Sequence, residues 1–167
     1  MNTYLMPKRL LSSLQWLLLL LALGAIYQWQ KRHLLDTGSE VSVTALPLLQ
    51  GGTAELAEPG KPTLIYFFAP WCNICAVSIG NLDGLDHEQL NIKRVAMDYA
   101  SLNDVAEFVE DNQVKGDILL GHEGLKQHFR VLGYPTYYLL DANNRIVASD
   151  MGYSSTIGLK VRQALAL

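Results

Sequence analysis

The strongest constraint on the fold of this chain is an apolar run that ends in two closely spaced cysteines. Residues 63–69, Thr-Leu-Ile-Tyr-Phe-Phe-Ala, are rich in β-branched and aromatic side chains and carry no charge. Such a run is typical of a strand that is buried on both faces of a parallel sheet. A proline ends the strand, and a helical pattern begins at Cys72. One face of that helix would hold Cys75, Ile79 and Leu82, so the sequence predicts a strand–turn–helix unit with both cysteines at its start.

The remainder of the chain alternates short strands with helices. The expected order is a hairpin within 46–56, the strand at 63–69 with its helix, a strand at 92–97, a helix from 101, a strand at 116–120, a short helix near 125–129, strands at 136–140 and 146–151, and a helix from 154. The helix from 101 is expected to bury Leu102, Val105 and Val109, and the last helix Ile157, Val161 and Leu165. This order predicts an α/β fold with a central mixed sheet flanked by helices.

The two cysteines are the only ones in the chain, so Cys72 and Cys75 have no third cysteine as a partner. A bridge between them would close a very small loop and would add little stability, which indicates a chemical role. A cysteine at the start of a helix lies near the positive end of the helix dipole and near free backbone N–H groups, and both favour the thiolate. We therefore expect Cys72 to be the nucleophile and Cys75, one turn further along, to be the resolving thiol.

Metal binding is the main alternative use of these thiols. A zinc site needs a second cysteine pair or a suitably spaced histidine pair, and the four histidines of the chain are scattered. Copper(I) binding by the two soft thiolates stays open as an alternative. We expect no cofactor and no resident metal apart from the redox-active disulfide.

Charge is divided unevenly along the chain. Residues 1–32 hold four Lys and Arg and no acid, whereas residues 33–167 hold nine Lys and Arg against sixteen Asp and Glu, a net charge of −7. An acidic body argues against nucleic acid as a partner, because phosphate binding requires clustered Lys and Arg.

An apolar segment near the N-terminus predicts a transmembrane helix. Residues 10–27 would rise about 27 Å as a helix, close to the thickness of a bilayer's hydrocarbon core. Tyr27 and Trp29 are placed for a membrane interface. The alternative is a cleaved signal peptide with a small-x-small site at 22–24. The predicted organisation is a tail at 1–9, an anchor at 10–29, a tether at 30–45 and a redox domain at 46–167.

The predicted location follows from the chemistry, because two Lys and Arg on each side of the apolar segment do not orient it. Continuous disulfide exchange suits an oxidising compartment. We therefore expect a single-pass protein of the bacterial inner membrane whose redox domain faces the periplasm.

Several segments resemble the thioredoxin superfamily. The residues from Phe67 to Cys75 resemble its strand and active-site motif, and Gly133-Tyr134-Pro135-Thr136 resembles its cis-proline loop. Residues 141–152 resemble the final hairpin of that superfamily. The extra segments at 46–61 and 102–120 are similar to the TlpA/ResA/DsbE branch, and residues 152–162 are similar to ScsD-like membrane-bound protein disulfide oxidoreductases.

The resemblance implies roles for five residues. Cys72 would be the nucleophile and Cys75 the resolving thiol. Pro135 would be cis and packed against the disulfide, the Tyr134 backbone would pair with a substrate chain as an added strand, and Trp71 would shape the rim of the site.

Two positions depart from the family pattern. Ile74 replaces the proline that usually precedes the second cysteine, and Tyr66 replaces a buried acid that serves proton transfer to the resolving thiol. Tyrosine is a much weaker base near neutral pH, so the identity of the proton relay is open.

The resulting functional prediction is a protein-disulfide oxidoreductase that exchanges disulfides with extracytoplasmic proteins. The favoured direction is that of a reductase supplied by a membrane-embedded electron donor. The alternatives are a disulfide-forming oxidant and a copper(I)-binding or thiol-protecting module without turnover.

Overall fold

The computed structural model describes residues 8–42 and 44–166 of the chain. It consists of two units, Met1–His33 and Leu34–Leu167. The first unit contains helix α1, Lys8–Lys31. Most of the predicted tail at 1–9 lies outside the described residues.

The predicted transmembrane helix at 10–29 is wrong. No helix among the described residues combines the length and the apolar character needed to cross a bilayer. The longest stretch of α1 without a charged or amide side chain lies between Gln15 and Gln28 and covers only the twelve residues 16–27. Twelve helical residues rise about 18 Å, well short of the roughly 30 Å hydrocarbon core.

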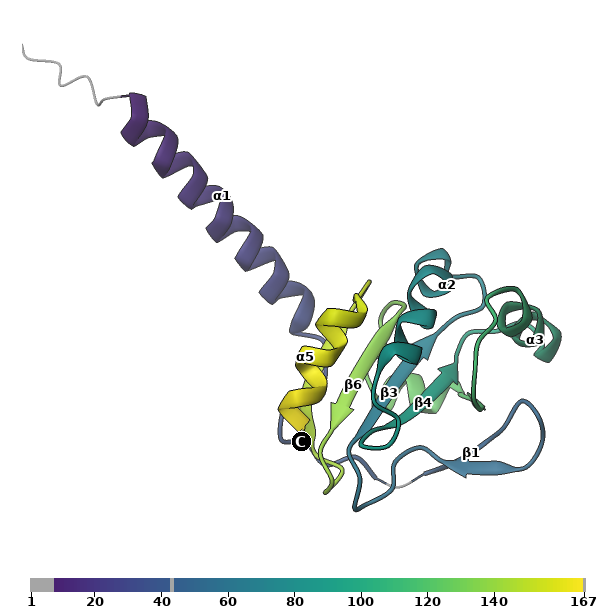
Figure 1. The fold of residues 1–167 in the computed structure, drawn as a ribbon. Coiled ribbons are helices and arrows are strands. Elements are labelled where there is room, and N and C mark those ends of the chain that lie inside the picture. The colour runs from purple at the N-terminus through teal and green to yellow at the C-terminus, as the bar shows by residue number, and fades with distance from the viewer. Residues whose placement is uncertain (1–7, 43, 167) are drawn as a thin grey trace, which may run out of the picture. The chain divides into compact units, whose positions relative to one another are not determined.

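The second unit is built on a five-stranded mixed sheet with the order β5-β4-β3-β6-β7 (Figure 1). Its strands are β3 Thr63–Phe68, β4 Asn91–Ala96, β5 Ile118–Leu120, β6 Thr136–Leu140 and β7 Ile146–Met151. Strands β3, β4 and β5 run parallel, whereas β6 and β7 pair antiparallel. A separate hairpin joins β1 Ala45–Pro47 to β2 Thr53–Glu55. The predicted mixed sheet and N-terminal hairpin are confirmed.

The central strand β3 is buried on both faces, as its composition predicts. Leu64, Tyr66 and Phe68 face one apolar cluster, and Ile65 and Phe67 face the other. The first cluster includes side chains from the helices α2 Asn73–Ile79, α3 Leu102–Asp111 and α5 Thr156–Ala166. The second includes side chains from the hairpin and from α4 Glu123–His128. The sheet is therefore covered on both faces, and a site can form at the ends of its strands.

Two predicted helix faces need correction. In α3, Val105 and Phe108 are buried whereas Leu102 is exposed. In α5, Ile157 and Val161 are exposed, and the buried positions are Leu159 and Gln163. The reason in α5 is a tertiary polar contact: the Gln163 amide binds the backbone of Asp86 in both directions, at 3.2 and 3.3 Å. The side chain of Leu165, which was also expected inward, lies outside the described residues.

The segment that follows α1 packs onto the sheet unit. Leu34 and Val41 are buried in the second apolar cluster. The backbone N–H of Gly38 donates to the carbonyl of Ile146 at 2.7 Å, and that of Val41 donates to Asn144 at 2.9 Å. The compact unit therefore begins at Leu34.

Candidate active site

Cys72 and Cys75 lie where β3 passes into α2, at the carboxyl edge of the parallel strands. They form a disulfide, and their Cα atoms are 5.2 Å apart. Cys72 is the N-cap residue of α2, and the backbone N–H of Cys75 points at its Sγ at 3.1 Å. An N–H donor at this position stabilises negative charge on sulfur, which favours the thiolate that attacks in disulfide exchange.

The two sulfurs differ in their access to solvent. Cys72 is 7% exposed and lines a surface groove, whereas Cys75 is fully buried. The buried face of the helix continues through Ile79 and Leu82, as predicted. At Gly80 the α-helix gives way to a short 3₁₀ helix, η1 Gly80–Gly84. An incoming disulfide can therefore reach Cys72, while Cys75 is restricted to attack on Cys72.

The predicted proline loop lies directly beside the cysteine pair. The Tyr134–Pro135 peptide bond is cis, as the resemblance implies. The carbonyl oxygen of Tyr134 lies 3.5 Å from Cys72 Sγ. The Thr136 hydroxyl donates to the carbonyl of Gly133 at 2.7 Å and closes the loop. The fold thus brings together two motifs that are about 60 residues apart in sequence.

Trp71 forms the exposed rim of the site. Its side chain is 65% exposed, and its indole N–H donates to the backbone carbonyl of Asp98 at 3.0 Å. Its ring also meets the Tyr134 ring edge-on, with centroids 5.7 Å apart. The Asp98 carboxylate forms an ion pair with Lys126 at 2.5 Å. Burial, and secondarily the nearby Asp98 carboxylate, raise the pKa of Tyr134, so this ring remains an uncharged wall of the site.

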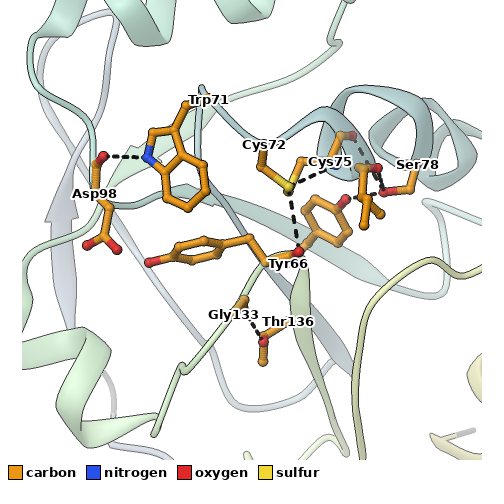
Figure 2. The surroundings of a disulfide bond; sticks show 10 residues. Tyr66, Trp71, Cys72, Cys75, Ser78, Asp98, Gly133 and Thr136 are labelled. Atoms are coloured by element: carbon orange, nitrogen blue, oxygen red, sulfur yellow. Dashed lines mark hydrogen bonds between the residues drawn. A yellow bond between two sulfur atoms is a disulfide. The ribbon is translucent and has the colours of Figure 1, made fainter.

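Tyr66 is buried on the face of β3 that packs against α2. Its hydroxyl shares a 2.6 Å hydrogen bond with the hydroxyl of Ser78, one turn beyond Cys75 (Figure 2). The Ser78 hydroxyl in turn donates to the carbonyl of Ile74 at 2.8 Å. Burial raises the pKa of Tyr66 above its ordinary value, although the bond to Ser78 opposes this. Tyr66 is therefore a neutral phenol throughout the physiological range and does not act as a base.

A row of polar residues crosses the sheet at the level of Tyr66. The row consists of four residues in register on β4, β3, β6 and β7: Arg94, Tyr66, Tyr137 and Asp150. Each is at most 7% exposed. Each end of the row is an ion pair, Arg94 with Asp83 at 3.0 Å and Asp150 with Arg162. The Arg162 guanidinium also lies over the Tyr137 ring, 5.4 Å from its centroid. Paired charges at both ends make this burial of polar groups tolerable.

The groove at Cys72 has a volume of about 530 Å³ and runs between α2, the loop after β4 and α3. Its lining includes four acids and no Lys or Arg: Asp98, Asp104, Glu107 and Asp111. Trp71 and Cys72 lie at one side of it. The groove is open to solvent, so a substrate can approach Cys72 through it.

The described residues contain no group of three or more His, Cys, Asp and Glu side chains that could hold a metal ion.

Comparison with known proteins places the chain in a family. The sequence model of the AhpC/TSA family matches residues 37–149, which include the whole strand–turn–helix unit and the proline loop. The chain belongs to the AhpC/TSA family. A thioredoxin-like protein of Haemophilus influenzae is 28% identical over 166 residues, which cover 93% of each chain. The predicted membership of the thioredoxin superfamily is confirmed.

Solved structures share the fold at lower identity. A structure assigned as the thiol:disulfide interchange protein DsbE of Chlorobium tepidum superposes with a TM-score of 0.68 at 23% identity, covering 79% of this chain and 97% of that one. The pneumococcal exposed lipoprotein thioredoxin Etrx1 of Streptococcus pneumoniae gives 0.63 at 23% identity, covering 74% and 98%. These neighbours show that the chain shares the thioredoxin-like fold of such proteins. The Chlorobium tepidum protein is assigned as a thiol:disulfide interchange protein, which is the enzyme class predicted from the sequence of this chain.

Sequence reasoning missed two residues beside the site, Ser78 and Asp98, and one at the end of the polar row, Arg94. Ser78 stands three positions after Cys75, so helical spacing alone could have placed it beside the resolving thiol. Asp98 follows β4 at the same sheet edge as Cys72, a position where parallel strands commonly carry functional groups. Arg94 carried no such signal, because its burial depends on the tertiary contact with Asp83.

Proposed function

We propose that this protein reduces disulfides in other proteins by thiol–disulfide exchange at Cys72 and Cys75. The observation that supports exchange at these residues is the asymmetry of the pair: Cys72 lines an open groove at a helix start, while Cys75 is fully buried and bonded to it. An accessible sulfur with a buried partner is suited to forming a mixed disulfide and then resolving it.

In the proposed reaction the thiolate of Cys72 attacks one sulfur of a substrate disulfide. A mixed disulfide forms, and the first substrate sulfur leaves as a thiolate that takes up a proton from solvent. Cys75, after losing its proton, attacks Cys72 Sγ and releases the second substrate sulfur. The substrate gains two electrons and two protons, and the Cys72–Cys75 disulfide remains. A protein dithiol is needed as the electron donor that restores the reduced pair.

The proposed location of the redox domain is a compartment outside the cytoplasm. Both cysteines of the chain belong to one exchange motif. Proteins with stable disulfides, which are the substrates of such a motif, occur in oxidising compartments. The structural neighbour from Streptococcus pneumoniae is described as an exposed lipoprotein, which supports the same setting for this fold.

Trapping of mixed disulfides tests the exchange chemistry. With Cys75→Ala, the covalent complex between Cys72 and a substrate is not resolved, so disulfide-linked protein complexes should accumulate and vanish on treatment with dithiothreitol. The matched control is Cys72→Ala, which leaves the buried thiol alone and should trap nothing. Absence of any trapped protein in Cys75→Ala would contradict the proposal.

The direction of exchange is tested by the redox state of the pair in cells. A reductase keeps a measurable fraction of Cys72 and Cys75 as the dithiol at steady state, which alkylation of free thiols followed by gel electrophoresis detects. A pair found fully oxidised, together with oxidation of reduced substrate proteins by the purified disulfide form, would establish the opposite direction.

A further inference from the structure

A second hollow lies at the opposite ends of the sheet strands from the cysteine pair. Strands β3 and β4 run parallel, and Asn91 at the start of β4 pairs with Thr63 at the start of β3. Cys72 follows the other end of β3, so Asn91 lies at the strand ends that are farthest from Cys72. Strand β5 pairs only with residues 94–96 of β4, so among the described strands residues 91–93 have no neighbour on that side. There the surface is hollowed to a volume of about 430 Å³. This hollow and the Cys72 groove share no lining residue.

The floor of the hollow contains a buried cation with unused hydrogen-bond donors. Arg94 is 3% exposed, and its side chain makes one hydrogen bond to the described residues, from Nη2 to Asp83 Oδ1 at 3.0 Å. Its Nε is buried without a partner. Its Nη1 packs against Gly116, so closely that a Cβ at that position would lie 3.3 Å away. A buried guanidinium with unsatisfied N–H groups is costly unless an acceptor completes it.

The walls of the hollow add further positive charge. Lys93 and Lys115 line it with Arg94, against the acids Asp83 and Asp117. Asp83 is already engaged through both oxygens, with Arg94 at 3.0 Å and Lys115 at 3.6 Å. Lys93 is partly engaged by Glu58, which lies outside the hollow. The lining therefore carries a charge of +1, although the chain from residue 33 onward carries −7.

We propose that this hollow binds the phosphate group of a small molecule. Arg94 Nη1 would donate from the floor, and Lys115, whose side chain is 79% exposed, would close over the anion from the rim. His87 is also in the lining. Guanidinium and ammonium groups converging from different directions suit a tetrahedral dianion better than a single planar carboxylate. The site goes beyond the proposed disulfide exchange and does not depend on it.

The test measures stabilisation of the full chain by inorganic phosphate. Thermal unfolding is followed in phosphate and in sodium chloride at equal ionic strength and pH, since a ligand of the folded state raises the midpoint beyond the effect of salt. In Lys115→Gln the affinity for phosphate should fall about tenfold, the equivalent of one charge-assisted hydrogen bond. The matched control, Lys160→Gln, removes one charge from an exposed position outside the hollow and should behave as the unaltered chain.

A second variant is designed to increase the affinity for phosphate. Asp83→Asn removes the carboxylate that occupies Arg94 and Lys115, so phosphate should bind more tightly and raise the unfolding midpoint by a larger increment, even if the midpoint without phosphate falls. A phosphate response no greater than that of chloride in both the unaltered chain and Asp83→Asn would overturn the proposal. Equal phosphate responses of Lys115→Gln and Lys160→Gln would overturn it as well.

Discussion

Tyr66 shows how one substitution changes the interior of this domain. The resemblance implies that a buried acid serves proton transfer at this position, whereas the tyrosine is held as a neutral phenol by burial and bonds to Ser78. It can orient or donate a hydrogen bond near Cys75, but it does not remove a proton. The proton on the resolving thiol must therefore leave by another group or by solvent.

Replacing Tyr66 with phenylalanine should lower stability without altering the pH dependence of exchange. The change deletes a buried hydrogen bond at 2.6 Å, which costs about 1 kcal/mol in the free energy of unfolding. Because burial raises the pKa of Tyr66 above the ordinary tyrosine value of about 10, the residue stays protonated between about pH 5 and 9. Urea unfolding and the pH–rate profile of exchange measure the two effects.

The matched control for that variant is Tyr153→Phe. Tyr153 is 58% exposed, and its hydroxyl accepts a long hydrogen bond from Asn81 at 3.4 Å. Its loss should change stability by a few tenths of a kcal/mol at most. A shifted limb in the pH–rate profile of Tyr66→Phe alone would show that this phenol takes part in proton transfer after all.

At the scale of elements, α3 borders the active-site groove and is fixed at its start by a capping box. The Ser101 hydroxyl accepts from the backbone N–H of Asp104 at 3.2 Å, and the Asp104 carboxylate accepts from the backbone N–H of Ser101 at 3.0 Å. Both contacts satisfy N–H groups that the helix cannot bond internally. The groove wall therefore depends on a local motif that the sequence displays directly.

Asp104→Asn should weaken α3 in a pH-dependent way. The hydrogen bond from the Ser101 hydroxyl, followed by the backbone N–H groups, holds the pKa of Asp104 below its ordinary value. A carboxylate whose pKa is lower in the folded state contributes stability above its unfolded pKa of about 3.9 and loses it as pH falls through the folded value. The variant should thus be less stable than the parent at pH 7 and converge with it in acid.

Urea unfolding of both proteins at several pH values between 3 and 7 measures this convergence. The matched control is Glu110→Gln. It removes an equal charge from the same helix but lies outside the capping box and the groove lining. A stability difference between parent and Asp104→Asn that is constant across this pH range would contradict the assignment of the carboxylate to the cap.

At the scale of the whole molecule, the compact unit extends further toward the N-terminus than its first strand. Leu34 and Val41 are 4% and 2% exposed, and the main chain around them bonds to the loop before β7. Burying two apolar side chains of this size contributes roughly 3–6 kcal/mol relative to leaving them in water. A segment that resembles a linker in composition is therefore part of the core.

Truncation tests this boundary. Removal of residues 1–33 should leave the denaturant midpoint of the remaining chain unchanged, because the two units are separately compact. Removal of residues 1–44 should cost several kcal/mol, through the lost burial of Leu34 and Val41. Chemical unfolding followed by circular dichroism provides the comparison, and equal midpoints for the two truncations would refute the assignment of this segment to the core.

The sequence by itself determined the elements whose signals are local. The uncharged run of β3, the helix that begins at Cys72 and the capping box at Ser101 each follow from neighbouring residues, because burial on two faces, helix dipoles and caps act over a few positions. The cysteine pair and the proline loop were also predicted, the latter through resemblance. The N-terminal segment was mispredicted, since its polar borders shorten the apolar stretch of α1.

Only the tertiary structure decided the features that join distant strands. The register of β3, β4, β6 and β7 aligns Arg94, Tyr66, Tyr137 and Asp150 in one buried row, and no local pattern encodes that alignment. The inward face of α5 was decided in the same way, by the bonds of Gln163 to Asp86. A polar side chain is buried where a partner from elsewhere in the chain satisfies it, and that partner exists only once the strands and helices have packed.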